Sequence, residues 1–443
     1  MAQIKPFYGI LPKRELASRI AALPYDVYSR AEAKAEVERE PLSFLRIDRA
    51  ETQFDDETDM YAPEVYQKAH DLLWKMISEG SFVKDGQLCY YIYELVMDGR
   101  AQTGLVACAA VDDYVNGVIM KHENTRAEKE LDRIRHVDVC GAQTGPIFLA
   151  YRRNETVSDC LRRAKEQEPI FDFVSEDGIS HRGWRISDEA MIKTIAEAFA
   201  GISRIYIADG HHRAASAVRV SLMRREEAKK RGEAADGCQE YDSFLSVLFA
   251  DDELRIMDYN RVAADLNGDT PEAFLEKIGQ KCEIRENTVL EHTCEGGICR
   301  MERKNLPCRP QEKGCMGMYL DGKWYELKVK EEYRSSHPID GLDVSILQRE
   351  ILEPVLGIGD PTTDERIHFV GGIRGLSDLQ RRVYTYGGVA FAMYPTSMEE
   401  LFAVADEHLL MPPKSTWFEP KLRSGLFIHA IGERAKEGQP VPG

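Results

Sequence analysis

The sequence lacks any apolar run long enough to cross a bilayer, and its first residues, MAQIKPFYGILPKRE, lack the continuous apolar core of a signal peptide. These absences predict a cytoplasmic protein without a membrane partner. An excess of positive charge is also missing, because 58 basic residues stand against 75 acidic ones, for a net charge of −17. Wrapping a nucleic acid needs a broad positive surface, so we expect no nucleic-acid partner, although a local basic pocket for a small anion remains compatible.

Closely spaced cysteine pairs are missing as well. Ten cysteines are present, and five of them lie close together: Cys282, Cys294, Cys299, Cys308 and Cys315. Their spacings include C-x4-C and C-x6-C but not the C-x2-C pairs of structural zinc sites. In a cytosolic chain this pattern favours reduced thiols over disulfides or a metal site.

The usual glycine-rich nucleotide motifs are absent too. There is neither a Walker A loop nor a G-x-G-x-x-G motif. FVGGIRG (369–375) and YGGVAFAMYP (386–395) are rich in glycine, but their spacing is typical of turns and close strand packing. Phosphate binding by this chain therefore needs another construction.

Periodicity predicts a mixed fold, α+β or α/β. Apolar residues at helical spacing predict helices over 61–82 and 186–201, the second with Ser187 as its N-cap. β-rich runs predict a hairpin over 88–114 that turns at Asp-Gly, and a strand followed by a polar stretch over 41–51.

The length of 443 residues predicts two or three lobes. The segment 243–262 is expected to form a pair of strands near the end of a first lobe, 1–264. A small mixed insert with the clustered cysteines is expected over 265–335, and a C-terminal lobe that closes a cleft over 336–443. No low-complexity linker separates them, so we expect packed lobes.

The stretch YIADGHHRAAS (206–216) places two histidines and an arginine directly after an Asp-Gly turn. An apolar β-run precedes the turn, and a helix is predicted to begin near His212. Such a strand-turn-helix directs the first free N–H groups of the helix, and its positive dipole end, at whatever lies above the turn. Gly210 permits close approach, and His211, His212 and Arg213 supply donors and charge, which favours a phosphate or another small oxyanion.

Asp209 has two roles open to it at this turn. It can cap the helix, or it can hold a cation such as Mg²⁺ that accompanies the phosphate. The alternative for the whole stretch is a capped helix with surface histidines.

The stretch IMKHENTRAEKELDR (119–133) crowds polar groups between a predicted strand and a predicted helix. Lys121, His122 and Glu123 are adjacent, and Thr125 follows. A carboxylate beside cations in such a loop can act as a base toward a hydroxyl or an amine. The alternative is a charged helix entry capped by a polar side chain such as Thr125.

The stretch MPPKSTWFEPKLRSGLFIH (411–429) has a stiff proline pair before Lys414, Ser415 and Thr416. These residues offer an ammonium group and two hydroxyls. Ligand sites favour crevices between lobes, so we expect this loop to face the Asp-Gly-His-His-Arg turn. The alternative is a rigid surface turn.

Several blocks, in order along the chain, resemble one family. YIADGHHR resembles the signature of the ParB/sulfiredoxin superfamily branch that includes the free-serine kinases, which phosphorylate the amino acid L-serine rather than protein. The longer pattern covers nearly the whole chain and is identified as belonging to the family called domain of unknown function 1015. Its blocks are PYDV (24–27), KHENT…EKELDR (121–133), GPIFLAY (145–151), YIADGHHR (206–213), MDYNRV (257–262) and MPPKSTWFEPKLRSGL (411–426).

The resemblance implies a small-molecule kinase, a phosphotransferase with an alcohol group as acceptor, built on a ParB/sulfiredoxin-like core within 1–264. It implies the formation of O-phospho-L-serine from L-serine, with Mg²⁺ and a donor that is ATP, ADP or pyrophosphate. Glu123 matches the base of those kinases, and residues 209–213 match the turn that holds the donor phosphates. The oligomeric state, with a homodimer among the candidates, stays open.

The assignments divide into two groups. Catalysis is assigned to Glu123, His211 and His212. Substrate or phosphate binding is assigned to Lys121, His122, Asp209, Gly210, Arg213, Lys414, Ser415 and Thr416, with Asp209 also the candidate Mg²⁺ ligand. The last three rest on their chemistry alone, because the C-terminal block has no counterpart in the small kinases.

Two other functions compete with the kinase. One is a ParB-like nucleotide-binding switch or DNA-partitioning protein, which the acidic balance and the lack of a basic stripe disfavour. The other is a sulfiredoxin-like reductase. Its nucleophilic cysteine would lie inside the phosphate turn, where this chain has His211 after Gly210.

Overall fold

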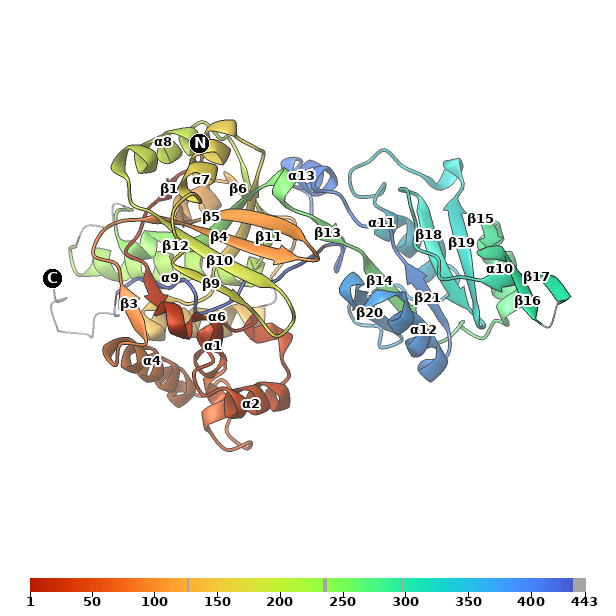
Figure 1. The fold of residues 1–443 in the computed structure, drawn as a ribbon, viewed down its shortest axis with the longest axis horizontal. Coiled ribbons are helices and arrows are strands. Elements are labelled where there is room, and N and C mark those ends of the chain that lie inside the picture. Colours follow the sequence, from red (N-terminus) through yellow and green to blue (C-terminus); the bar gives the residue numbers. More distant parts are fainter. Residues whose placement is uncertain (126, 234–236, 296–297, 433–443) are drawn as a thin grey trace. The chain divides into compact units, whose positions relative to one another are not determined.

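The computed structural model divides into two compact units (Figure 1). Unit 1 comprises Met1–Leu254 and the segment that starts at Pro420, and unit 2 comprises Arg255–Glu419. The structure describes residues 1–125, 127–233, 237–295 and 298–432, and for 292–295 and 298–300 it describes the backbone.

The division differs from the three consecutive segments expected from the sequence, 1–264, 265–335 and 336–443. The sheet of unit 2 takes strands from all three of these segments, so its hydrogen bonds cross both expected boundaries. The chain also returns to unit 1 after Glu419. The closing of a cleft by 336–443 stays a prediction.

Unit 1 is built on a long mixed sheet. In spatial order its strands are β6 (Ile119–Met120), β11 (Ile205–Asp209), β8 (Ile147–Tyr151), β12 (Ser243–Ala250), β5 (Arg100–Ala110), β4 (Tyr90–Met97), β10 (Ser180–Ile186) and β9 (Phe171–Val174), with β1 (Ile4–Lys5) paired to β5. β11 runs parallel to β6 and antiparallel to β8, and β12 runs parallel to β8 and antiparallel to β5. The predicted mixed α/β fold is thereby confirmed.

Two short sheets complete the strands of unit 1. β2 (Ile10–Pro12) pairs with β3 (Phe82–Lys84), and β7 (Ala142–Gln143) pairs with β23 (His429–Ala430). The second pair ties the C-terminal segment to unit 1.

The helices of unit 1 follow the expected periodicity in most places. They are α1 (Ala17–Ile20), α2 (Arg30–Arg39), α3 (Leu45–Asp48), α4 (Pro63–Ser78), α5 (Val111–Val115), α6 (Ala127–Cys140), α7 (Glu155–Ala164), α8 (Glu189–Ala200) and α9 (His211–Lys230). α4 and α8 confirm the helices predicted over 61–82 and 186–201. The N-cap of α8 is Asp188 and not Ser187, because the Asp188 carboxylate accepts the N–H of Met191 at 2.8 Å.

The predicted hairpin over 88–114 is confirmed as β4 and β5. Asp98 and Gly99 form its turn with φ of 51° and 78°. Positive φ at both central residues matches the right-handed twist of the two strands, and an Asp-Gly pair favours it.

The prediction of a strand over 41–51 was wrong. This segment contains α3 and a 3-10 helix, Ala50–Gln53. Leu45 and Ile47 are buried in a cluster with apolar residues of α4, so tertiary packing holds a helix too short to be stable alone.

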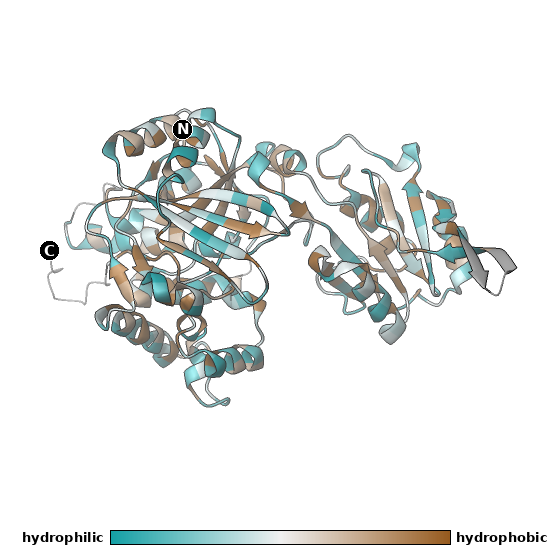
Figure 2. Ribbon diagram, viewed as in Figure 1, coloured by the Kyte–Doolittle hydropathy of each residue, from teal (hydrophilic) through white to brown (hydrophobic). Residues whose placement is uncertain are grey.

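The core of unit 1 lies along the sheet. Buried residues of β4, β5, β8, β11 and β12 pack with residues of α7, α8 and α9. Figure 2 shows hydrophobic residues along these strands and mixed colours on the helices. Burial of this apolar surface fixes β11 and the start of α9, where the polar turn lies.

Unit 2 has a sheet of its own. In spatial order its strands are β15 (Cys282–Glu286), β19 (Lys323–Val329), β18 (Cys315–Leu320), β21 (Val389–Ala392), β14 (Tyr259–Ala263) and β20 (Ile367–Gly371). Two strand pairs accompany it, β13 (Ile256–Met257) with β22 (Trp417–Phe418) and β16 (Thr288–Glu295) with β17 (Ile298–Asn305). Its helices include α10 (Pro271–Gly279), α11 (Asp343–Leu347), α12 (Gly375–Tyr386) and α13 (Met398–Asp406).

The strands expected as a pair over 243–262 do not pair with each other. β12 belongs to the sheet of unit 1, and β14 belongs to the sheet of unit 2. The break falls at the unit boundary after Leu254.

Of the clustered cysteines, Cys282, Cys308 and Cys315 are buried and free. The side chains of Cys294 and Cys299 lie outside the described residues. Among the helices that the structure describes, none is long and apolar enough to cross a membrane.

Candidate anion-binding site at the start of α9

The strand-turn-helix expected at 206–216 is present. β11 ends at Asp209, Gly210 is left-handed with φ 92° and ψ 31°, and α9 begins at His211. A Cβ on Gly210 would lie 3.1 to 3.3 Å from the guanidinium group of Arg213, so glycine is needed for the backbone conformation and for the space. A helix start directs its first backbone N–H groups outward, which is the construction that suits an anion.

Asp209 is held by two donors. The N–H of Gly210 donates to one carboxylate oxygen at 2.7 Å, and the ammonium group of Lys421 donates to the other at 2.9 Å. Burial alone would raise the pKa of Asp209, but the charges of Lys421 and Arg213 hold it below its usual range. Lys421 was not among the assigned site residues, although it follows the expected PPKST loop in the same block.

His211 and His122 form a buried pair beside the turn. Their exposed fractions are 5% and 2%, and their rings lie edge to face with centroids 4.5 Å apart. Burial lowers the pKa of His122 to about 4, and burial together with the His122 ring lowers the pKa of His211 well below its usual value. Both imidazoles are therefore neutral at pH 7.

Several nitrogens of this pair lack a partner. Across the described part of the chain, Nε2 of His211 makes no hydrogen bond. The ring nitrogens of His122 make none of ordinary geometry, although the backbone of Ile207 lies near that ring. Buried polar atoms of this kind are normally satisfied by protein, water or ligand. An oxyanion at the turn is one partner that neutral histidines can donate to.

Glu123 lies at the same turn, far from it in sequence. One of its carboxylate oxygens is 3.9 Å from Nδ1 of His211, and its side chain is half exposed. Lys121 is exposed, and its ammonium group lies over the ring of Tyr114 at 5.0 Å. The KHE stretch and the turn are thus brought together in unit 1.

Arg213 points toward the start of β8. Its guanidinium donates to the carbonyl of Pro146 at 2.7 Å, and it lies close to Gly145. His212 follows His211 in the first turn of α9 and is half-buried. Thr125 donates to a carboxylate oxygen of Glu130 at 2.7 Å, near the start of α6.

Lys414, Ser415 and Thr416 lie in unit 2. Lys414 has a φ of 60°, and its carbonyl accepts a hydrogen bond from Arg261 at 3.0 Å. The buried hydroxyl of Ser415 donates to the carbonyl of Pro412 at 2.6 Å, so it holds the loop together. That this loop faces the turn of unit 1 stays a prediction.

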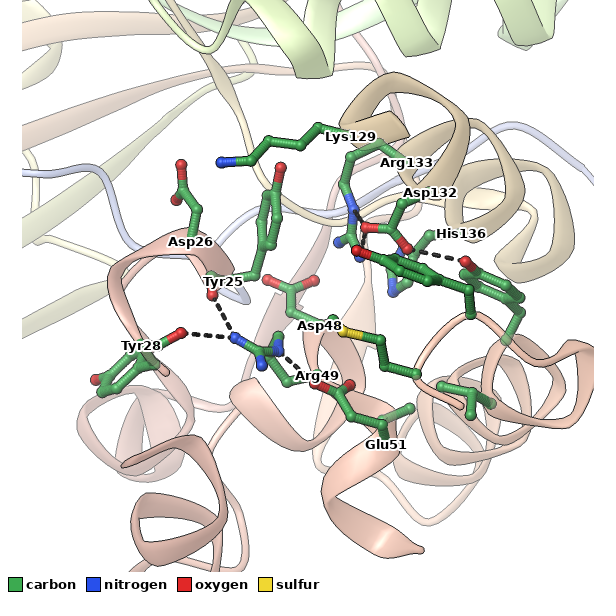
Figure 3. Close-up of a pocket in the computed structure, with 15 residues that line it drawn as sticks. Tyr25, Asp26, Tyr28, Asp48, Arg49, Glu51, Lys129, Asp132, Arg133 and His136 are labelled. Carbon is green, nitrogen blue, oxygen red and sulfur yellow. Dashed lines mark hydrogen bonds and ion pairs between the residues drawn. The ribbon is translucent and has the colours of Figure 1, made fainter. Parts of the chain in front are cut away.

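A cavity of about 200 Å³ lies in unit 1 (Figure 3). A smaller one of about 30 Å³ shares Tyr25, Asp48, Arg133 and His136 with it and is also lined by Arg213. The two cavities therefore extend from α3 and α6 to Arg213, in the first turn of α9.

The cavity residues come from separate blocks of the sequence. Tyr25 belongs to PYDV, and Asp132 and Arg133 belong to EKELDR. Asp48, Arg49 and Glu51 lie in the segment that we expected to be a strand. Tyr25, Asp132 and Arg133 could have been found as site residues because they belong to the family blocks. No motif in the sequence marked Asp48, Arg49 and Glu51.

No cluster of three metal-ligating side chains occurs in the described ranges of the chain. Mg²⁺ commonly takes one or two carboxylates together with substrate phosphates, so a single carboxylate such as Asp209 is enough for a shared site of this kind. As a carboxylate beside an anion-type turn, Asp209 fits such a shared cation in exchange for the Lys421 ammonium.

The fold and the turn define a mixed α/β protein with a polar strand-turn-helix of the anion-binding kind. Residues 4–345 match the model of a family described as "Protein of unknown function (DUF1015)". The chain belongs to this family, as the resemblance of its blocks predicted. No curated protein matches the chain.

Among solved structures, the chain is similar to a free serine kinase in complex with AMP, at 12% identity over 71% of this chain and 86% of that chain, with a TM-score of 0.32. It is similar to SbnI with a C-terminal truncation from Staphylococcus aureus, at 11% identity over 71% and 82%, with a TM-score of 0.33. A conserved hypothetical protein from Pyrococcus furiosus matches at 13% identity over 72% and 93%, with a TM-score of 0.30. Likenesses at this level establish no activity for this chain.

Proposed function

We propose that this protein is a small-molecule kinase that transfers a phosphoryl group from ATP, ADP or pyrophosphate to the hydroxyl of free L-serine, giving O-phospho-L-serine. The observation that carries the proposal is the convergence of Glu123 and the neutral His122–His211 pair at the start of α9. The resemblance of the family blocks to the free-serine kinases supplies the acceptor.

The donor phosphates would bind at the helix start. There the first N–H groups and the positive dipole end of α9 would attract oxyanions. Gly210 permits close approach, and Lys421 and Arg213 add positive charge. Phosphoryl transfer depends mainly on such positioning and charge neutralisation.

Glu123 would take the proton from the serine hydroxyl. The hydroxyl oxygen then forms a bond to the terminal phosphorus, and the bond from that phosphorus to its bridging oxygen breaks. The electron pair leaves with ADP, AMP or phosphate, according to the donor. His211, whose Nδ1 lies 3.9 Å from the Glu123 carboxylate, would orient this base when the two groups approach to hydrogen-bond range in the complex with substrate.

Mg²⁺, when bound, would be held by Asp209 with the donor's own phosphate oxygens and would neutralise their charge. Exchange of the Lys421 ammonium for the metal would keep Asp209 paired throughout. The neutral ring of His211 and the half-buried ring of His212 would each donate a hydrogen bond to the phosphate.

The test is to incubate the purified chain with L-serine, Mg²⁺ and, separately, ATP, ADP or pyrophosphate, and to detect phosphoserine by mass spectrometry. We expect product with at least one donor. No phosphoserine with any of the three would overturn the proposal. Salt-dependent binding to DNA by the same preparation would instead favour the partitioning-type alternative.

A further inference from the structure

The cavity of unit 1 is sized for a small metabolite. Its volume of about 200 Å³ is below the roughly 300–1,000 Å³ of pockets that bind drug-sized ligands. Its wall consists of Tyr25, Asp26, Tyr28, Asp48, Arg49, Ala50, Glu51, Met60, Tyr61, Val65, Tyr66, Lys129, Asp132, Arg133 and His136. This lining combines ionisable side chains with tyrosine rings, which suits a small ligand that carries charge.

Two of the cations in this wall are already neutralised by carboxylates within it. Arg49 forms an ion pair with Glu51, and Arg133 bonds Asp132 through Nε at 2.8 Å. The hydroxyl of Tyr66 also donates to Asp132 at 2.9 Å. Neither pair needs a ligand to balance its charge.

Asp48 is the carboxylate that these pairs leave over. It is 5% exposed, and the Thr144 hydroxyl donates to one of its oxygens at 2.9 Å. Among the described residues it forms no direct ion pair. The charge of Asp48 helps to raise the pKa of Arg133, but that guanidinium is already bonded to Asp132. A buried carboxylate to which no cation is bonded directly is costly. Burial lowers the pKa of the neighbouring His136, so that imidazole does not supply the charge.

Tyrosine rings line the cavity around this carboxylate. They belong to Tyr25, Tyr28, Tyr61 and Tyr66, and one face of Tyr25 already carries the Arg133 guanidinium at 4.0 Å. Aromatic faces attract cations, most of all desolvated ones. Rings and a carboxylate together favour an ammonium group.

Lys129 supplies the opposite charge at the rim. In the view of Figure 3 it lies at the far end of the Tyr25 side chain from Asp48. It is exposed, and within the described ranges it forms no ion pair; Asp26 is exposed at the same rim. A carboxylate on the ligand would meet this ammonium while its amine meets Asp48.

We propose that this cavity binds a free α-amino acid, its ammonium group held by Asp48 and its carboxylate by Lys129. The inference deepens the proposed function, on which it rests for the choice of L-serine. The smaller adjoining cavity is lined by Arg213, so an amino acid bound here lies beside the turn assigned to the phosphate donor.

The test is calorimetric titration of the full chain with L-serine in the absence of any nucleotide. Ethanolamine, which lacks the carboxylate, and glycerate, which lacks the amine, serve as probes of each contact. We expect L-serine to bind more tightly than both. Asp48→Asn should raise the Kd for L-serine about 10–100-fold, because it removes one charge and little volume. Asp159→Asn, an exposed carboxylate on α7, is the matched control and should leave it unchanged.

A well-folded Asp48→Asn with the wild-type Kd would overturn the inference, as would a wild-type chain that binds no L-serine at millimolar concentration. If Asp48→Asn melts at a lower temperature than wild type, the exposed substitution Lys129→Glu is used instead. We expect it to raise the Kd for L-serine, and an unchanged Kd would contradict the inference. Binding without phosphoserine would sink the kinase and keep the inference. If Asp48→Asn forms phosphoserine with an unchanged KM for serine, the kinase proposal stands and the inference about the cavity is wrong.

Discussion

Single residues at the start of α9 combine burial with chemistry in an unusual way. His122 and His211 are buried, neutral and in contact, and Glu123 extends from the same loop into a half-exposed position. A surface helix start has no need of this arrangement. Each of these residues therefore supports a prediction of its own.

Replacing Glu123 with glutamine removes the proposed base but keeps the shape of the side chain. We expect turnover to fall about 10²-fold or more while nucleotide affinity and the fold are retained. Steady-state kinetics with phosphoserine as product measure the loss. Glu128→Gln, exposed on α6, is the control. Unchanged turnover in Glu123→Gln would remove this residue from the mechanism.

His122 should make the stability of unit 1 depend on pH. Its pKa is about 4 in the folded chain and about 6.5 when unfolded, so the unfolded state takes up the proton first as the pH falls. The neutral His122 ring contributes its full stability to the fold above pH 6.5. As the pH falls toward 4 this contribution, on the order of 3 kcal/mol, is lost. We expect the free energy of unfolding, measured with urea at several pH values in this range, to change less with pH in His122→Phe than in wild type. Equal slopes would mean that the ring is hydrated in the folded state.

Whole elements are fixed at this site by the C-terminal segment. β23 pairs with β7, Lys421 bonds Asp209 at the end of β11, and Arg423 donates to the hydroxyl of Ser175, just after β9, at 3.3 Å. The turn before α9 is therefore held by a segment that belongs to unit 1 but follows unit 2 in the chain.

Lys421→Met removes the cation that faces Asp209. Because 35% of the Asp209 side chain is exposed, water screens the pair, and we expect at most about 1 kcal/mol of stability to be lost at pH 7. The depressed pKa of Asp209 stabilises the fold above the unfolded value of about 3.9, so the difference from wild type should shrink below about pH 4. Urea unfolding at pH 7 and pH 3 measures it. Lys193→Met, in an exposed pair on α8, is the control, and a difference that grows in acid would contradict the pairing.

Elements with strong local signals could be predicted from the sequence. α4 and the β4–β5 hairpin follow from periodicity and from an Asp-Gly turn, and the α9 turn follows from the position of Gly210. α3 could not be predicted, because its four residues, Leu-Arg-Ile-Asp, alternate apolar and charged as in a strand, and its apolar residues are held by packing on α4. The cavity escaped for the same reason, since Asp48 lies on that helix.

At the scale of the whole molecule, unit 2 interrupts unit 1 between Leu254 and Pro420. Long-range pairs such as Lys421 with Asp209 leave no local trace in the sequence, so the expected boundaries near 264 and 336 followed composition instead. The mixed fold was within reach of the sequence, but the return of the chain to unit 1 was not.

Lys414→Ala tests whether unit 2 takes part in the reaction. The positive φ of Lys414 and its bond from Arg261 hold this loop in one shape, which lowers the entropy cost of presenting its ammonium group. If it contacts the transferred phosphate or the serine carboxylate, kcat/KM should fall by a factor that corresponds to about 1.5–3 kcal/mol of lost transition-state stabilisation. Lys313→Ala is the control, because Lys313 also lies in unit 2 and forms an ion pair with Glu400 there. Wild-type kinetics in Lys414→Ala would leave the loop structural.

The interruption of unit 1 also sets an order on the ribosome. Asp209 emerges 212 residues before Lys421, with all of unit 2 made between them. At about 5–20 residues per second, the carboxylate waits roughly 10–40 s for its cation. During that interval β7 also lacks β23, so the nascent unit 1 carries an open edge and an incomplete turn until the segment that contains Lys421 and β23 has been made.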